Sequence, residues 1–466
     1  MLEVKTPAEV YEIIDSVCPK LGATGDDFCV VSAVSAVGRV LFEDVIAGEN
    51  IPGFDRSMVD GYAVIASDTF GCSESNPAVL KPVGEVLMGF GAEFSLKAGE
   101  CGVVSTGGDI PAGADSVVMV EHTEDFGGGL IGICKPAAPG NNIIYADDDA
   151  AFGSILLERG KLLTAHDIGV LAVAGYCEVK VYRKPLVGII STGDELVGVC
   201  GDSRASCDSN NSGASCVSGS SCACGSFGAL KQPLLRGQVR DVNTPLLMAV
   251  INSSGGESKD YGIYKDDEDL IRSALSKAVS ECDIVLISGG SSAGEKDKTA
   301  SIISSLGEVL FHGIAMKPGK PTIFGLVQNT PVFGLPGHPI ASFMITELFV
   351  RHTLCHMLNT PFNKKTTIAT LTEAISSNHG REEYILVKLV ENNCKSDTGN
   401  NDNQQRTEIK HKIVTKHQSV AKHQTAAPIK SKSGLITSLT SADGYICIPR
   451  NCEGFPKGTE VTVAYF

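Results

Sequence analysis

Hydrophobic and polar positions alternate in blocks along the second half of the chain. Short, nearly continuous apolar runs take turns with stretches in which apolar residues recur at helical spacing. The expected strands are 186–191, 260–265, 283–288 and 308–315, and the expected helices between them are 244–256, 267–282 and 296–307. This alternation is typical of a parallel sheet covered by helices on both faces, which binds its ligands beyond the carboxyl ends of the strands.

The first half of the chain has a different pattern. Residues 7–20 predict an amphipathic helix capped by Thr6, and residues 32–48 predict a segment that turns from helical to extended. Between about residues 58 and 142, short β-branched runs interrupted by glycine predict a small, mainly β domain. Helical spacing returns at 162–175. We therefore interpret the β region as an insertion into a helical domain.

The last part of the chain predicts a long helix at 340–358, followed by short strands that we expect to form a small β barrel or sandwich. Two segments have too few apolar residues to hold a fixed shape and are expected to be disordered inserts. They are residues 198–231, rich in Ser, Gly and Cys, and the polar tract 391–432. A zinc site at the five cysteines between Cys200 and Cys224 is the alternative for the first insert.

Composition narrows the classes of partner. With 466 residues, of which 43% are hydrophobic, the chain can form several domains with cores of their own. The formal charge of -15 argues against nucleic acid or an anionic membrane surface as the main partner. The pattern shows no secretory signal and no membrane span, and most of the 16 cysteines are scattered singly. We expect a cytoplasmic protein.

The strongest local signal is DIVLISGGSSAGEKD, residues 283–297, where an apolar strand leads through a loop into a helix that begins near Asp297. Backbone N–H groups of such a loop can point at a phosphate. The spacing is neither that of Walker A nor that of a dinucleotide motif, and a plain turn with helix-capping serines is the alternative. The candidate anion-binding residues here are Ser288, Gly289, Gly290, Ser292, Gly294 and Lys296.

Three more loops follow expected strands: STGDEL at 191–196, MKPGKP at 316–321 and GLPGHPIAS at 334–342. Prolines around a glycine fix the backbone of such a loop, and each loop taken alone could be a plain turn. Lys317 and Lys320 supply compact positive charge that suits an oxyanion.

Carboxylates occupy several of these connections. Glu195, Asp266 and Asp297 would repel a phosphate unless a hard cation lay between them, which predicts Mg²⁺ or a similar ion. Asp55 and Asp60 lie on a separate loop, IPGFDRSMVDGYAV. Polar groups on such a loop are often placed for contact with a ligand, and a solvated Asx turn is the alternative.

Five motifs in this order, PGFDRSMVDGYAV, STGDEL, ISGGSSAGEKD, MKPGKP and GLPGHP, resemble the molybdopterin molybdotransferase family, which includes bacterial MoeA and the gephyrin E domain. The likeness covers nearly the whole chain apart from the two inserts. It implies an elongated dimer with an α/β and β multidomain fold. The implied domains are 1–50 plus 143–181 (N-terminal, discontinuous), 51–142 (mainly β, inserted), 182–356 (molybdopterin-binding, α/β) and 357–466 (C-terminal β).

The resemblance implies a transferase that inserts molybdate into adenylylated molybdopterin, with Mg²⁺-dependent release of AMP, to give molybdenum cofactor. In known members the active site forms across the dimer interface, between the sheet and the part that carries DGYA. The implied partners are small-molecule substrates, a second copy of the chain, a molybdopterin adenylyltransferase and apo-molybdoenzymes. A molybdopterin adenylyltransferase and a non-catalytic, gephyrin-like scaffold are the alternatives, and tungstate is the alternative oxyanion.

Matching the motifs position by position implies functional roles for individual residues. The implied catalytic residues are Asp60, Thr106, Asp149, Glu195, Asp266 and Asp297. We assign Glu195, Asp266 and Asp297 to the metal because carboxylates suit a hard cation, and contact with the pterin is the alternative for Glu195. The candidates for binding molybdate or another anion outside the SGG loop are Lys317, Pro318, Lys320, Pro321 and Ser342.

Two departures from the family pattern are visible. The family commonly has G-x-N-x-R-x-x-G-E-D, whereas this chain has GNNIIYADDD, with Ile144 for the arginine and Asp147 for the glycine, although Asp149 keeps the last acid. Isoleucine cannot replace the bidentate anion contact of arginine, and its presence would fit the scaffold alternative. In GLPGHP, His338 stands for the usual asparagine.

Overall fold

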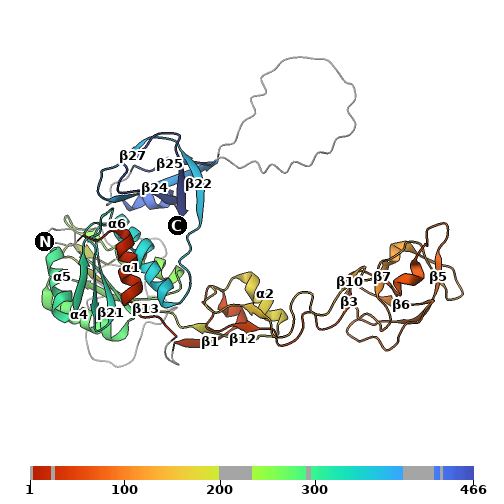
Figure 1. Cartoon of the computed structure of the whole chain (residues 1–466). Coiled ribbons are helices and arrows are strands. Elements are labelled where there is room, and N and C mark those ends of the chain that lie inside the picture. Colours follow the sequence, from red (N-terminus) through yellow and green to blue (C-terminus); the bar gives the residue numbers. More distant parts are fainter. Residues whose placement is uncertain (1–3, 23–26, 199–233, 290–294, 392–423, 431–433) are drawn as a thin grey trace, which may run out of the picture. The chain divides into compact units, whose positions relative to one another are not determined.

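The computed structural model describes residues 4–22, 27–198, 234–289, 295–391, 424–430 and 434–466 (Figure 1). The chain separates into two compact units, Met1–Thr24 with Arg183–Phe466, and Gly25–Tyr182. Apart from Gly198, the expected insert at 198–231 lies outside the described residues, as does most of the tract 391–432. No helix in the described part of the chain combines the length and the apolar character needed to cross a bilayer.

A six-stranded sheet forms the centre of the larger unit, in the order β16-β13-β17-β21-β20-β18. In that order the strands are Glu257–Tyr264, Leu186–Thr192, Ile284–Ser288, Thr330–Leu335, Ile323–Val327 and Glu308–His312. The first three are parallel, as predicted, and β21, which was not among the expected strands, is parallel to β17. Strand β20 runs antiparallel to both of its neighbours, so the strand expected at 308–315, observed as β18, has no parallel partner in the sheet. Every residue of β17 is buried, which explains its continuous apolar sequence.

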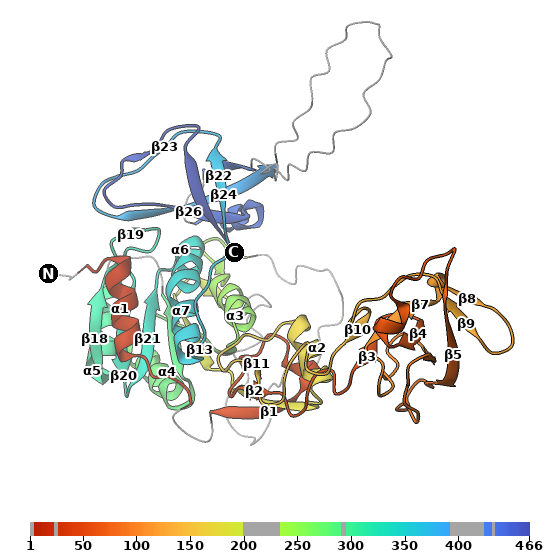
Figure 2. The same cartoon turned by 45° about the vertical axis from the view of Figure 1, so that its right-hand side comes forward.

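Helices cover both faces of this sheet. The connecting helices are α3 (Asn243–Ser253), α4 (Glu268–Glu281) and α5 (Glu295–Leu306), close to the predicted ranges. Because β13 lies between β16 and β17, right-handed crossovers place α3 and α4 on opposite faces. Helix α4 contacts α5, whereas α3 contacts α6 (Pro339–Ile345), as Figure 2 shows.

The helix predicted at 340–358 is continuous but not uniform. It runs from α6 through a π-helical turn, Thr346–Val350, into α7 (Arg351–Met357). Helix α1 (Pro7–Val17) packs against α7 and therefore belongs to this unit. It begins at the predicted cap, where the Thr6 hydroxyl accepts the N–H of Glu9 at 3.3 Å and the Glu9 carboxylate accepts the N–H of Thr6 at 2.7 Å.

The C-terminal strands form a closed, barrel-like sheet, as predicted. The order β24-β25-β22-β28-β26 is closed by pairing of β24 with β26, and β19 pairs with the outer edge of β24. The strands are β19 (Met316–Lys317), β22 (Thr366–Leu371), β24 (Glu382–Glu391), β25 (Gln424–Pro428), β26 (Gly444–Ile448) and β28 (Glu460–Tyr465). Short pairs elsewhere in the unit are β14 (Leu196–Val197) with β15 (Val239–Arg240), and β23 (Ile375–Ser376) with β27 (Gly454–Phe455).

Strand β25 corrects one expectation. It lies inside the tract 391–432, which we expected to be disordered throughout, and this is wrong for residues 424–428. The strand pairs with both β24 and β22, and Ala426 at its centre is fully buried. Its low hydrophobicity concealed it, because two alanines between a threonine and a proline do not form an apolar run.

The unit Gly25–Tyr182 has a small α/β part and a β part. In the first, β1 pairs with β12 and β2 with β11, next to α2. Its elements are β1 (Phe28–Ser32), β2 (Val45–Ile46), β11 (Ile155–Leu157), α2 (Ala165–Val173) and β12 (Glu178–Tyr182). The helical segment expected within 32–48 is a single 3-10 turn, Ala33–Ala36.

The β part is inserted in the sequence between β2 and β11, as expected, but the part that receives it is not the helical domain that we expected, because it contains the strand pairs β1–β12 and β2–β11. It contains a six-stranded sheet in the order β7-β4-β6-β5-β9-β8, together with the short pair β3–β10. The strands are β3 (Arg56–Ser57), β4 (Gly61–Val64), β5 (Ala78–Glu85), β6 (Glu100–Val104), β7 (Ser116–Met119), β8 (Thr123–Asp125), β9 (Ile131–Ile133) and β10 (Ile143–Ile144).

Candidate active site

The carboxyl ends of the four parallel strands gather the loops that the sequence singled out. Ser288 is the last residue of β17 and Gly289 follows it. Glu195 lies just after β13, Asp266 just after β16, and His338 after β21. These strands are neighbours in the sheet, so the loops that follow them meet at one edge.

A buried polar network holds this edge together. Asn243, at the start of α3, donates from Nδ2 to Ser288 Oγ at 2.8 Å and to the carbonyl of Gly337 at 2.9 Å. Asp241 accepts the N–H of Asn243 at 3.0 Å and the hydroxyl of Thr244 at 2.6 Å. Asn243 was not among the expected site residues, because nothing in GQVRDVN indicates that its side chain reaches the ends of β17 and β21.

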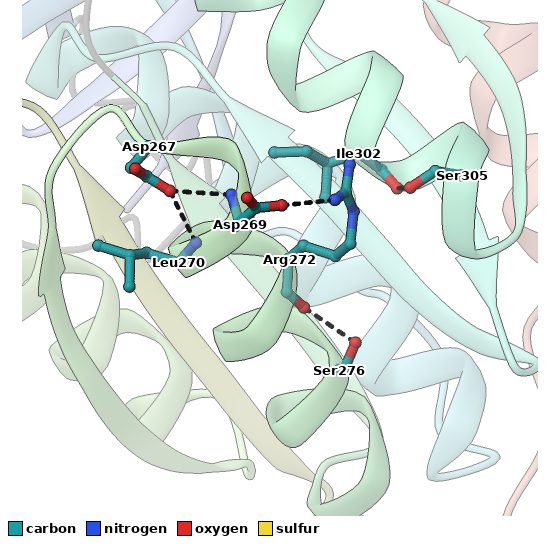
Figure 3. Close-up of polar contacts among 7 residues, drawn as sticks. All are labelled: Asp267, Asp269, Leu270, Arg272, Ser276, Ile302 and Ser305. Carbon is teal, nitrogen blue, oxygen red and sulfur yellow. Dashed lines mark hydrogen bonds and ion pairs between the residues drawn. The ribbon is translucent and has the colours of Figure 1, made fainter.

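The position of Asp266 is fixed from two sides. Its neighbour Asp267 caps α4 by accepting two N–H groups of the helix at 3.0 and 3.1 Å (Figure 3). The backbone N–H of Asp266 donates to Asp194 Oδ1 at 3.5 Å, and its carbonyl accepts Nζ of Lys298, from α5, at 3.2 Å. Asp266 is half-buried.

Glu195 is also half-buried, and its carbonyl accepts the N–H of Val239 at 2.9 Å. The side chain of Asp297, the third expected metal ligand, lies outside the described residues, as do the side chain of Lys296 and all of Gly290, Ser292 and Gly294. Among the side chains that are described, no three His, Cys, Asp or Glu residues form a group that could hold a metal ion. The three-carboxylate metal site therefore stays a prediction.

A cleft of about 730 Å³ lies between the MKPGKP and PGHP loops and the C-terminal barrel. Lys317 Nζ forms an ion pair with Glu383 Oε1 at 2.5 Å, and the Ser377 hydroxyl donates to Glu383 Oε2 at 2.7 Å. Lys320 and Arg381 also line the cleft, and neither has a carboxylate partner in the described part of the chain. Two cations that have no carboxylate partner among the described residues thus line one cleft, and Arg381 belongs to no motif that the sequence singled out.

The remaining anion candidates of this region lie at different depths. Pro318 and Pro321 line the cleft with the lysines. Ser342, in contrast, is fully buried in the first turn of α6, where its hydroxyl donates to the carbonyl of Pro336. The structure thus gives Ser342 a place behind the PGHP loop, and a role in anion binding stays a prediction. His338 is exposed and lines the cleft.

In the other unit, Asp60 and Thr106 form a pair. Asp60 Oδ1 accepts the backbone N–H of Thr106 at 2.6 Å and its hydroxyl at 2.9 Å. These hydrogen bonds, the backbone one foremost, lower the pKa of the exposed Asp60 carboxyl. The next residue is Gly61, and its lack of a side chain is required by space. A Cβ there would lie 2.0 Å from the carbonyl oxygen of Val118, so β4 and β7 could not pair as closely with any other residue at this position.

The other residues of interest in this unit hold loops. Asp55 Oδ1 accepts the N–H of Ala146 at 2.7 Å, as a structural turn acid would. Asp147 has a φ of 72°, in the left-handed region, which explains why the family commonly has glycine there. Asp149 is exposed and donates its N–H to the carbonyl of Ile51 at 3.0 Å. Ile144, in β10, pairs with Arg56.

Comparison with known proteins agrees with this architecture along the chain. The MoeA N-terminal region (domains I and II) matches residues 6–175, a probable molybdopterin binding domain matches 188–356, and the MoeA C-terminal region (domain IV) matches 405–466.

Relatives and solved structures cover nearly the full length. A molybdopterin biosynthesis protein of Methanocaldococcus jannaschii is 32% identical over 93% of this chain and 91% of its own. The molybdopterin molybdenumtransferase of Bacillus subtilis is 30% identical over 99% of this chain and 95% of its own. The crystal structure of the molybdopterin biosynthesis MoeA protein from Pyrococcus horikoshii OT3 matches with a TM-score of 0.76 and 30% identity, covering 100% of both chains. The chain therefore belongs to the MoeA family.

Proposed function

We propose that this protein inserts molybdate into adenylylated molybdopterin and releases AMP, so that molybdenum cofactor is formed. Relatives from Bacillus subtilis and Nostoc that bear the name molybdopterin molybdenumtransferase support a role in molybdenum cofactor biosynthesis. The structural observation that carries the proposal is the cleft beside the sheet edge, where Lys320 and Arg381 lack carboxylate partners in the described part of the chain.

The charges in this cleft suit a tetrahedral dianion. Lysine acts as a point charge, and the planar guanidinium of arginine can donate two parallel hydrogen bonds to one oxyanion. Glu383, the acid that lines the cleft, is paired with Lys317, which reduces its repulsion of an incoming anion. We assign molybdate to Lys320 and Arg381, with Lys317 within reach if its ion pair opens.

The neighbouring sheet edge is assigned to the substrate's phosphate groups and to Mg²⁺. Glu195 and Asp266 follow adjacent strands, β13 and β16, and both are half-buried oxygen donors, which fits a hard cation. With Asp297 they would hold Mg²⁺, which when bound would neutralise charge on phosphate oxygens as AMP leaves. Ser288 and Gly289 would orient the phosphate from the end of β17.

Asp60, kept ionised by Thr106, would accept a hydrogen bond from the substrate. We propose a cytoplasmic homodimer that receives its substrate from a molybdopterin adenylyltransferase and passes the product to apo-molybdoenzymes. These assignments rest on the family resemblance.

The cleft assignment is tested by AMP release from adenylylated molybdopterin at a series of molybdate concentrations. Removing a charged hydrogen-bond donor costs about 1.5–3 kcal/mol, so Arg381→Met should raise the KM for molybdate roughly 10- to 100-fold and change kcat little. Arg450→Met is the matched control, because Arg450 is exposed in the same barrel but does not line the cleft. Equal KM values for the two variants would contradict the assignment of molybdate to this cleft.

A further inference from the structure

A small recess lies at the carboxyl ends of β13, β17 and β21, next to the cleft, with which it shares Pro321 and Pro336. Thr192, Gly289, Lys298 and Asp266 line it, together with Thr299, Gly334, Leu335 and four further apolar residues. Its volume of about 20 Å³ is close to the space that one water molecule needs. It therefore has room for a single oxygen atom of a ligand.

Two donors face this recess. Thr192 is only 4% exposed, and its hydroxyl has no hydrogen-bond partner within the described residues. Lys298 is half-buried, and the one contact of its ammonium group among those residues is with the carbonyl of Asp266, at 3.2 Å. That contact leaves the positive charge without a carboxylate partner in the described chain.

Gly289 keeps the recess open. A Cβ at this position would lie 3.2 Å from Thr192 Oγ1, closer than most Cβ contacts, and would fill the space between the hydroxyl and β17. The backbone of Gly289 is not in the left-handed region, so its lack of a side chain is explained by space and not by conformation.

We propose that Lys298 and Thr192 bind one terminal phosphate oxygen of an adenosine 5′-phosphate group. An ammonium and a hydroxyl that converge on a space of one oxygen atom favour an anionic oxygen acceptor. The inference rests on the proposed function, in that it assigns this oxygen to the AMP half of the substrate. It adds Lys298, which lies outside the motifs, and Thr192, which lies in STGDEL but was not among the expected site residues.

A purely structural role for Lys298 makes different predictions. In that case its contact with the Asp266 carbonyl would only tie α5 to the start of α4, and replacing it would lower stability without selecting among ligands. Comparing AMP with adenosine separates the two roles, because the two molecules differ only in the phosphate.

The test is calorimetric titration of the full-length protein with AMP and with adenosine. We expect the wild type to bind AMP more tightly than adenosine, and Lys298→Met to weaken AMP binding about 10-fold or more while adenosine binding is unchanged. Lys298→Arg should retain most of the affinity, and Thr192→Val and Gly289→Ala should each weaken AMP binding. Lys277→Met, an exposed lysine of α4, is the matched control and should bind both ligands as the wild type does.

Several results would overturn the inference. They are equal AMP affinity in Lys298→Met and the wild type, equal losses for AMP and adenosine, and no preference of the wild type for AMP. Displacement of AMP from this site by molybdate alone would also contradict it, since the recess would then serve the other oxyanion. If the wild type releases AMP only with molybdate present while Lys298→Met binds AMP normally, the proposed function stands and only this inference falls.

Discussion

Asp55 and Asp60 lie five positions apart, on either side of β3, and have different surroundings. The Asp55 carboxylate accepts a backbone N–H from Ala146 and holds two segments of its unit together. The Asp60 carboxylate takes both of its hydrogen bonds from Thr106 through one oxygen, Oδ1. The second oxygen of Asp60 has no partner in the described part of the chain, so Asp60 retains the capacity to accept from a ligand.

The Thr106 hydroxyl should contribute measurably to the ionisation of Asp60. Thr106→Val removes the hydroxyl contact and keeps the stronger backbone one, so the pKa of Asp60 should rise toward its ordinary value without reaching it. Because the pKa of Asp60 is lowered in the folded protein, this interaction favours folding above the carboxyl's ordinary pKa and is lost as the pH falls through the lowered value.

A carboxyl ¹³C NMR titration of the wild type and of Thr106→Val measures this difference. Thr123→Val, whose hydroxyl donates to a backbone carbonyl in the same unit, is the control and should leave the titration of Asp60 unchanged. An identical pKa of Asp60 in wild type and Thr106→Val would show that the side-chain hydrogen bond has no influence.

Single residues of the site could be predicted from the sequence only where they lie in a motif. Lys317 and Lys320 stand in MKPGKP, and their charge suggested an oxyanion site. That Lys317 pairs with Glu383 could not be foreseen, because the two residues are far apart in sequence and meet only where β19 joins β24. Arg381 was not predicted as a site residue for the same reason, since a lone arginine in a loop of the barrel belongs to no local sequence pattern.

At the scale of elements, strongly patterned segments were predicted well. Helix α4 has an acidic cap and helical apolar spacing, and β17 is apolar up to its last residue, Ser288, so sequence and structure agree closely for both. The hairpin β20–β21 was missed because its turn uses Gln328 and Asn329, both with positive φ. Asparagine adopts this conformation readily, but glutamine does so rarely and gave no turn signal.

The connection between α7 and the barrel contains a lysine that is sensitive to pH. Lys364 Nζ donates to the Tyr445 hydroxyl at 2.7 Å and lies 4.8 Å from the ring centroid of Phe362. Burial lowers the pKa of Lys364 from its ordinary 10.5 to about 8. Between these values the unfolded chain binds a proton that the folded chain lacks, so this lysine makes the free energy of unfolding increase with pH from about 8 to 10.5.

Replacing Lys364 should remove this contribution. We expect the wild type to gain stability relative to Lys364→Met as the pH rises from about 8 to 10.5, in urea unfolding measured at several pH values. Lys365→Met alters the exposed neighbour and should follow the wild type at every pH. Parallel stability curves for the wild type and Lys364→Met would contradict a lowered pKa.

At the scale of the whole molecule, the expected site residues are divided between the two compact units. Asp60, Thr106 and Asp149 belong to Gly25–Tyr182, whereas Glu195, Asp266 and the lysines of MKPGKP belong to the larger unit. The parallel sheet of the larger unit could be predicted because its hydrophobic pattern is long and distinct. The grouping of α1 with the larger unit could not, because it depends on packing against α7, more than three hundred residues away.

The measurement that tests the proposed reaction most directly counts both products in one sample. The full-length protein is incubated with adenylylated molybdopterin, Mg²⁺ and molybdate, and the AMP released is compared with the molybdenum bound to the separated pterin. Molybdate insertion predicts equal amounts of the two, and no AMP when molybdate is omitted. Release of AMP at the same rate without molybdate, or pterin that carries no molybdenum, would contradict it.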